Sequence, residues 1–305
     1  MLRDLLRSHT RLFLDQESHF VPWVYRAYGD PSTEQKAVAM GMEILRVLAR
    51  RGFQTDLQAE DFASCRSYQE AASLPFRRAA DLAGKPRWGD KTPHYVEHID
   101  VIREIFPSSL FIHIVRDGRD VARSMLASHF GPNTIYSAAQ TWRRRVRAGI
   151  DARNRLGESV VHQLRYEDLL TSPEPCLREL LAFLGEPFEP GVLQATVLAH
   201  KPPVDLLAPT GARKRKRNPS AIDPTRAGRW RHSLTQRQRG RFESIAADLL
   251  SECGYVIEGL GTPLPRWQRA GWQTVEWSMR LFARMRYADL GREWARNQWL
   301  RLRAR

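Results

Sequence analysis

The sequence has 305 residues, of which 42% are hydrophobic and 27% charged, proportions typical of a globular protein that can bury a full core. This composition excludes an intrinsically disordered chain. The net charge of +14 is concentrated in residues 266–305 and in the run Arg213–Arg217, and the rest of the chain is nearly balanced. A uniformly basic protein that coats nucleic acid is therefore also excluded.

The cysteines and the apolar segments narrow the class of protein. Cys65, Cys176 and Cys253 are far apart and accompany no histidine cluster, so neither a disulfide framework nor a zinc site is expected. No apolar stretch reaches the ~20 residues of a membrane span. Arg3 and Arg7 interrupt the start, where a signal peptide would have its apolar core. We expect a reduced, cytoplasmic protein.

The first predicted elements place an acid after a short strand. An apolar stripe predicts a helix over 1–8, and the run Leu12–Leu14 predicts a strand that leads to Glu17. Glu17 has the position of a site residue, although without further context an ordinary loop acid explains it better. Helical periodicity predicts an amphipathic helix over 33–51 and one or two more over 56–83.

Gly and Pro then bound a loop around Lys91, after a second short strand. Lys91 lies between Asp90 and Thr92, where it is either a fixed cation for an anionic ligand or an ordinary surface lysine. A helix is predicted over 97–106, closed by Pro107.

The most informative stretch is the strand–turn–helix pattern over 110–124. The apolar run Leu110–Val115 predicts a strand buried on both faces, and Asp117 with Asp120 predicts a capped helix start. Arg116 then lies at the carboxyl end of the strand and Ser124 on the first turns of the helix. A guanidinium and a hydroxyl beside a helix N-terminus make a good phosphate site. An ordinary strand–turn–helix with solvated arginines explains the stretch equally well.

The order of elements predicts the fold class. Strand, loop, helix, strand and helix follow one another over 88–125, which is the signature of a parallel sheet. A long helix over 138–156, a strand over 160–164 and a helix capped by Ser172 continue the alternation. We expect an α/β protein of three layers, with a parallel sheet flanked by helices.

The C-terminal third predicts a loop, a helix and an extension. Residues 201–229 are rich in Pro, Lys and Arg and have no core of their own, and an amphipathic helix is predicted over 234–254. Two prolines then mark a linker, which divides an α/β domain over 1–262 from a basic, Trp-rich helical extension over 263–305. Residues 266–305 either dock on the domain or on a second copy of the chain, or contact a membrane surface.

Taken in order, these pieces resemble the sulfotransferase family, in particular the branch with bacterial and tyrosylprotein sulfotransferases. The stretch Ile114–Asp120 with Ser124 is similar to the strand and helix that bind the 3′-phosphate of the donor. Asp90–Pro93 resembles the family's lysine loop, and Gly228–Trp230 resembles the loop that closes over the nucleotide. Glu17, after the first helix and strand, resembles the family's general base.

The resemblance implies a P-loop-type fold and transfer of a sulfuryl group from 3′-phosphoadenosine 5′-phosphosulfate to a hydroxyl or amine, with no metal ion. Glu17 would take the proton from the acceptor, and Lys91 would stabilise charge on the leaving phosphate. The residues implied to hold the 3′-phosphate come from the strand–helix pattern and the C-terminal loop: Arg116, Ser124, Arg226, Gly228 and Arg229.

One departure from the family concerns the 5′-phosphosulfate loop. The family begins with a strand and a loop of the Arg-Ser-Gly-Thr-Thr type before the helix that here starts at Met1, and this sequence has neither. Either the native chain extends upstream, which we favour, or this member has half a donor site. Losing one preorganised donor typically costs ~10²–10³ in rate. We expect residues 1–305 to bind the donor weakly and turn over slowly, and robust sulfate transfer would contradict this.

The rival hypothesis is a non-catalytic protein, either a nucleotide-binding domain or a basic scaffold for nucleic acid or anionic membrane. A solvated loop explains Arg213–Arg217 better, because no aromatic residues are interleaved with it. The acceptor stays open among small molecules, saccharides, lipids and peptides, since acceptor pockets are built from variable loops, here 20–40 and 200–225.

Overall fold

The computed structural model describes residues 1–14, 17–53, 55–127, 134–193 and 222–261. They form two compact units, the first of Met1–Arg116 with Arg144–Arg229, the second of Asp117–Arg143 with the chain from Trp230 onward. The basic run Arg213–Arg217 and the extension 263–305 lie outside the described residues, so the expectations about them stay predictions. Among the described residues, no helix has the length and hydropathy needed to cross a membrane.

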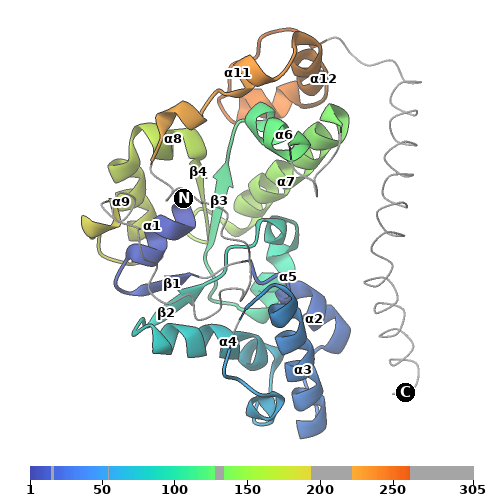
Figure 1. Ribbon diagram of the computed structural model, residues 1–305, viewed down its shortest axis with the longest axis vertical. Helices are drawn as coiled ribbons and strands as arrows, with labels where there is room; N and C mark the ends of the chain where they lie inside the picture. Colours follow the sequence, from blue (N-terminus) through green and yellow to red (C-terminus); the bar gives the residue numbers. More distant parts are fainter. Residues whose placement is uncertain (15–16, 54, 128–133, 194–221, 262–305) are drawn as a thin grey trace. The chain divides into compact units, whose positions relative to one another are not determined.

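The strands of the first unit pair in parallel. β1 (Leu12–Leu14) pairs with β2 (Arg87–Gly89), and β3 (Phe111–Val115) pairs with β4 (Val161–Arg165). The helical connections between paired strands are those that parallel pairing requires (Figure 1). The predicted α/β class with parallel strand pairing is confirmed. Among the described residues, β2 and β3 belong to separate two-stranded sheets.

Helices surround these strands. The first unit contains α1 (Leu2–Ser8), α2 (Val21–Tyr28), α3 (Glu34–Arg50), α4 (Tyr68–Leu82), α5 (Ile99–Ile105), α8 (Tyr166–Thr171), α9 (Pro173–Leu184) and the short 3-10 helices η1 (Ala59–Phe62), η2 (Pro93–His98) and η3 (Pro224–Arg226). The boundary between the units falls within α7 (Ile135–Leu156). α2 corrects the expected loop over 20–40: it buries Val21, Pro22 and Val24, and its Pro22 lies in the first turn, where a missing N–H costs nothing.

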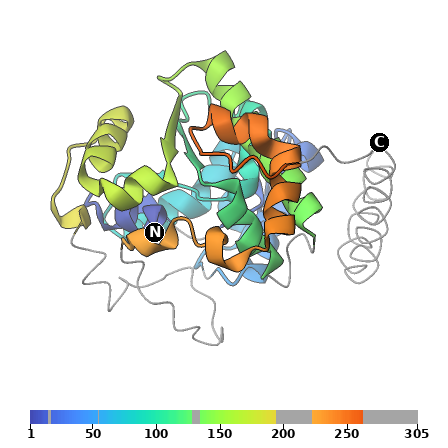
Figure 2. The ribbon, with the colours of Figure 1, turned by 90° about the horizontal axis from the view of Figure 1, so that it is seen from above.

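Among the described residues, the first unit has two larger apolar cores and a smaller one around Ile99, Ala152 and Val161. One of the larger cores lies among α2, α3 and α4, where Met40, Phe62 and Phe76 are at most 1% exposed. Gly41 lets α3 approach η1 closely, because a Cβ at this position would overlap the ring of Phe62. The other larger core joins the leucines of α1 to those of α9, which lie side by side (Figures 1 and 2).

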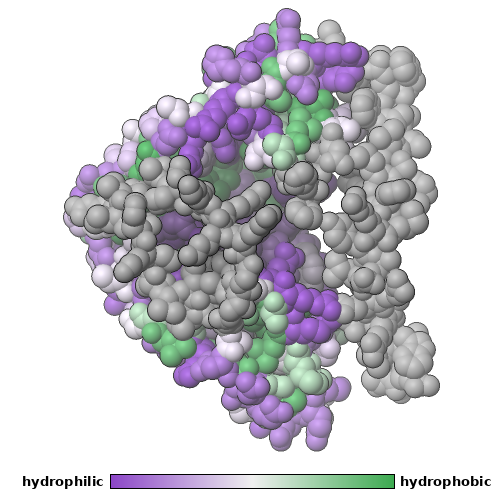
Figure 3. Space-filling model, viewed as in Figure 1, coloured by the Kyte–Doolittle hydropathy of each residue, from purple (hydrophilic) through white to green (hydrophobic). Residues whose placement is uncertain are grey.

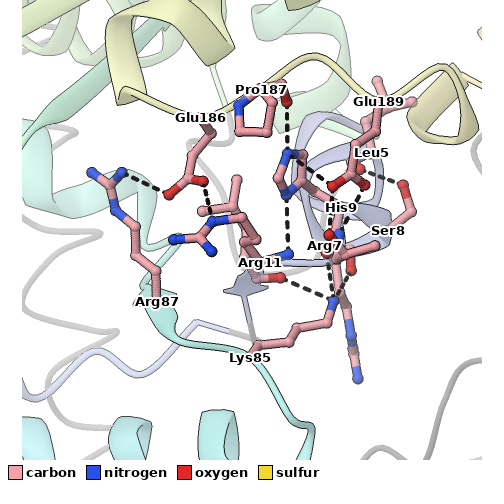
Figure 4. Close-up of polar contacts among 12 residues, drawn as sticks. Leu5, Arg7, Ser8, His9, Arg11, Lys85, Arg87, Glu186, Pro187 and Glu189 are labelled. Carbon is pink, nitrogen blue, oxygen red and sulfur yellow. Dashed lines mark hydrogen bonds and ion pairs between the residues drawn. The ribbon is translucent and has the colours of Figure 1, made fainter.

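A polar cluster ties the amino ends of β1 and β2 to the segment after α9 (Figure 4). The ammonium of Lys85 donates to the carbonyls of Arg7, His9 at 2.9 Å and Leu12 at 3.0 Å, so it satisfies carbonyls left by the end of α1. His9, which is 0% exposed, hydrogen-bonds through Nε2 to the carbonyl of Pro187 at 2.9 Å. This cluster supports the fold at the strand ends opposite those that lead to Glu17 and Lys91.

The second unit is organised around a buried arginine. It includes α6 (Gly118–Leu126), α11 (Trp230–Ser233) and α12 (Gln236–Glu252). Asp117 caps α6 as predicted, accepting a hydrogen bond from the Arg119 amide at 2.9 Å. Asp120, in the first turn of the same helix, accepts from the Trp230 amide at 2.9 Å. The acid that sequence spacing placed at the start of this helix thus also has a tertiary partner.

Burial corrects another expectation. The sequence predicted a strand buried on both faces at β3, but Ile114 is 39% exposed. The face of β3 that carries Ile114 is therefore partly open to solvent at this position. On the face drawn in Figure 3, polar residues predominate among the described residues, with apolar residues in small groups. Trp23 on α2 and Met42 on α3 are among the exposed large apolar residues, at 45% and 54%.

Candidate functional site

Two loops that follow paired parallel strands carry the predicted catalytic residues. β1 leads to Glu17 and β2 leads to Lys91, and parallel strands send their following loops to the same edge of the sheet. The Lys91 ammonium donates to Glu17 Oε1 as an ion pair. The two side chains are 39% and 43% exposed, so they are accessible to a reactant. The structure thus brings together residues 74 positions apart in the chain.

His19 is the site residue that sequence reasoning missed. Its Nε2 donates to Glu17 Oε2 at 2.9 Å, so each carboxylate oxygen of Glu17 has a cationic or polar donor. The backbone of His19 has a φ of 60°, in the left-handed region that non-glycine residues seldom adopt. The hydrogen bond from His19, followed by that from Lys91, lowers the pKa of Glu17 to about 2 against the effect of burial. Glu17 is therefore a carboxylate at any neutral pH.

A second set of hydrogen bonds lies behind this pair. Asp90 accepts from the hydroxyl of Ser18 and from Thr92 Oγ1, the latter at 3.1 Å. Ser18 Oγ also bonds the hydroxyl of Tyr95 at 2.9 Å, and that hydroxyl accepts from the Val21 amide at 3.1 Å. Burial raises the pKa of Asp90 to about 6 and also raises the pKa of Tyr95. The two loops are joined by polar contacts as well as by the Glu17–Lys91 pair.

A cationic group lies beyond His19. The His19 and His94 rings are 5.8 Å apart, and Arg145 Nη2 donates to His94 Nδ1 at 2.8 Å. Arg145 also donates through Nε to the carboxylate of Glu97 at 3.4 Å. The same carboxylate accepts from Arg144 Nε at 2.5 Å. Arg145 thus links Glu97 to the histidine that lies against His19.

The predicted donor-binding residues of the first unit also lie together. Arg116 directly follows β3, as the sequence predicted, and its Nη2 donates to the carbonyl of Arg226 at 2.8 Å. Its guanidinium lies 4.5 Å from the centre of the Tyr166 ring. Arg229 donates to the Thr225 carbonyl at 2.8 Å. The C-terminal loop that carries Arg226 and Arg229 is thus anchored at the carboxyl end of β3.

Gly228 and Ser124 are the remaining residues predicted to bind the donor, and they belong to different units. Gly228 has a φ of 71°, which a glycine adopts without strain, between the anchored residues of the loop. Ser124 is exposed on α6 and belongs to the second unit. Its expected role beside Arg116, and with it a cavity shared by Arg116, Ser124, Lys91 and Glu17, stays a prediction.

Comparison with known proteins identifies the family. The model described as the sulfotransferase family matches residues 1–190, which include both loops of the site and the strand before Arg116.

This chain belongs to the sulfotransferase family.

Individual relatives match shorter stretches of this sulfotransferase-family chain. It is 26% identical over 122 residues to a protein-tyrosine sulfotransferase of Drosophila melanogaster, covering 38% of this chain and 24% of the relative. It is 33% identical over 107 residues to the omega-hydroxy-beta-dihydromenaquinone-9 sulfotransferase of Mycobacterium bovis, covering 31% of this chain and 28% of the relative. The chain therefore spans about a quarter of the length of these curated relatives.

A solved structure supports the fold. The sulfotransferase domain from the curacin biosynthetic pathway superposes with a TM-score of 0.54 at 21% identity, covering 84% of this chain and 93% of that one. At that identity the likeness shows the sulfotransferase fold, which the strand–turn–helix pattern and the order of motifs had predicted.

Proposed function

We propose that this chain transfers a sulfuryl group from 3′-phosphoadenosine 5′-phosphosulfate to a hydroxyl or amine acceptor. The observation that carries the proposal is the direct contact of Glu17 with Lys91 across two loops that follow parallel strands. In-line transfer of an anionic group between two oxygens needs a base on the acceptor side and a cation on the leaving-group side. The two residues supply this pair of charges.

Each member of the pair has a definite task in the transfer. The acceptor oxygen forms a bond to sulfur while the bond from sulfur to the donor's phosphate oxygen breaks. Glu17 takes the proton that the acceptor loses, and Lys91 stabilises negative charge on the departing oxygen. A carboxylate with a pKa of about 2 is a weak base. It suffices because the acceptor proton becomes more acidic as the new bond to sulfur forms.

The residues at the end of β3 fit an anionic nucleotide donor. Guanidinium groups bind phosphate oxygens through pairs of N–H groups, and Arg116, Arg226 and Arg229 are close to one another in the first unit. The family motif adds Gly228 and Ser124. We assign the 3′-phosphate to these residues on the chemistry of the donor set together with the motif.

The acceptor belongs to the class that the relatives' names describe, a hydroxyl on a peptide or on a small molecule. α2 begins two residues after His19 and carries Trp23, which is 45% exposed. The Trp23 ring contacts the His98 ring edge-on, with 4.2 Å between the ring centres. The guanidinium carbon of Arg26 lies 5.7 Å from the centre of the Trp23 ring. An exposed indole beside a cation offers an apolar surface to the acceptor skeleton.

The test is transfer of labelled sulfate. The protein is incubated with sulfur-labelled donor and a panel of a tyrosine peptide, a saccharide, a long-chain alcohol and 4-nitrophenol, and labelled product and adenosine 3′,5′-bisphosphate are measured. We expect Lys91→Ala to lower kcat ~10²–10³-fold and Glu17→Gln ~10²–10⁴-fold. Lys36→Ala and Glu60→Gln, which change exposed side chains elsewhere, are expected to retain wild-type rates. Wild-type protein that gives no labelled product and no nucleotide release overturns the proposal.

A further inference from the structure

The two loops of the site are joined twice by neighbouring residues. Glu17 and Ser18 are adjacent in one loop, and Asp90 and Lys91 are adjacent in the other. Glu17 contacts Lys91, and Ser18 contacts Asp90. The outer contact is open to water, with side chains about two-fifths exposed, whereas Ser18 is 0% exposed. The inner contact is therefore the one that water competes for least.

The hydrogen atoms of the inner contact have one consistent arrangement. The Val21 amide can only donate, so the Tyr95 oxygen accepts from it and the Tyr95 hydroxyl donates to Ser18. The Ser18 hydroxyl then donates to Asp90 Oδ2, while Thr92 donates to Oδ1 at 3.1 Å. Ionised Asp90 is the end of this chain of donors, because a carboxylate accepts and never donates. Its charge therefore orients every hydroxyl in the chain.

We propose that Asp90 is a positioning residue of the sulfuryl-transfer site. Through the hydroxyl of Ser18, it holds the loop of Glu17 against the loop of Lys91 so that base and cation keep their separation. The inference rests on the proposed function, since it assigns Asp90 a task in that reaction. Asp90 acts through its neighbours and contacts no reacting atom itself.

The charge of Asp90 makes the contact sensitive to pH. The titratable groups around it are Glu17 and His19 in the facing loop, Lys91 beside it, and Tyr95 in η2. Burial raises the pKa of Asp90 to about 6, so below that pH a proton occupies a carboxylate oxygen that otherwise accepts. Transfer activity is expected to decline as the pH falls through 6. Glu17, with a pKa of about 2, does not titrate there.

The contribution of Asp90 to stability depends on pH in the opposite sense to its contribution to activity. This difference distinguishes a positioning role from a purely structural one. The folded-state pKa of Asp90 lies above the ordinary value of 3.8, so the folded protein retains a proton that the unfolded chain releases. The contribution of Asp90 to stability therefore falls as the pH rises from about 4 to 6 and stays low above 6. Asp90→Asn removes that cost at pH 7.5. Its Tm is expected to be no lower than that of the wild type.

The experiment measures kcat, KM for the donor and Tm from pH 5 to 8, with 4-nitrophenol and with water as acceptors. Asp90→Asn is expected to lower kcat about 10- to 100-fold, because a small displacement of a reactive group has an effect of this size. It is also expected to remove the acid limb of the pH profile, which is the decline in kcat as the pH falls through 6. KM for the donor and Tm should change little. Ser18→Ala is expected to lower kcat and move the acid limb to higher pH, because ionised Asp90 loses a donor.

Matched controls cover the two variants. Ser73 is a buried serine whose hydroxyl donates within α4 to the Gln69 carbonyl at 2.6 Å, and Ser73→Ala should leave the rate and its pH profile unchanged. Asp100 is an exposed carboxylate paired with Arg155, and Asp100→Asn should do the same. His19→Gln distinguishes an acid limb due to the histidine, because it retains the limb that Asp90 produces.

Several results overturn the inference. Asp90→Asn with wild-type kcat and an unchanged acid limb does so while leaving the proposed function intact. A fall in kcat that only follows a lower Tm assigns Asp90 a structural role and also rejects it. If the wild-type protein and Lys91→Ala are equally inactive toward every acceptor, the proposed function fails and this inference fails with it.

Discussion

At the scale of a residue, the hydrogen bonds of Glu17 decide its protonation state. From the sequence alone, an ordinary loop acid explained Glu17 better than a site residue did. In the structure it is held by His19 and Lys91, which stabilise the charged form against burial. Its lowered pKa means that it stabilises the folded state at pH values above 4.5, and that this contribution is lost as the pH falls toward 2.

The His19 hydrogen bond is testable by itself. His19→Ala removes the imidazole N–H that donates to Glu17. We expect the pKa of Glu17 to rise, because the bond from His19 is the largest of the causes that lower it. The measurement is the carboxyl carbon shift of Glu17 in an NMR titration. A midpoint identical to that of the wild type would show that Lys91 alone sets the charge.

At the scale of an element, α6 illustrates a buried charge that is fully paired. Arg119 is 1% exposed and donates to Asp117, to Glu243 at 2.9 Å and to the Val256 carbonyl at 2.9 Å. Its guanidinium also lies 3.8 Å from the centre of the Trp230 ring. The arginine that follows the strand motif thus binds α6 to α11 and α12 within the second unit.

Removing Arg119 leaves the buried acids Asp117 and Glu243 without the cation that pairs with both. Arg119→Ala is expected to lower the free energy of unfolding by about 3–5 kcal/mol, because breaking a buried pair uncovers charges that burial disfavours. Urea unfolding measures the loss. Arg237→Ala, which changes an exposed side chain of α12, is the control and should shift the unfolding free energy by less than about 0.5 kcal/mol. A loss at Arg119 as small as that of the control would mean that the cluster does not hold the unit.

At the scale of the whole molecule, donor binding should stabilise the fold. Adenosine 3′,5′-bisphosphate, which carries the 3′-phosphate, is expected to raise Tm, with a stabilisation of about 2.7 kcal/mol at a concentration one hundred times Kd. Arg116→Ala should abolish the shift, because its guanidinium is the proposed phosphate ligand. Thermal unfolding with and without the nucleotide measures both. An equal shift in Arg116→Ala would place the nucleotide elsewhere.

Local sequence signals predicted most elements and three charged residues of the candidate site. Periodicity located α3, α9 and α12, and the motif pattern picked out Glu17, Lys91 and Arg116. These signals act over one turn or one strand, where side-chain spacing and turn residues decide the backbone. The family followed from the order of several such motifs.

Tertiary structure decided what no local pattern contains. Ser18 and Asp90 are 72 residues apart, and their bond exists because two parallel strands end at the same edge. Asp120 accepts from the Trp230 amide, 110 residues away, a partner that its place at a helix start did not indicate. Sequence determined which residues carry charge and where chains turn; the folded chain alone determined which charges meet, because electrostatic partners are chosen by distance in space.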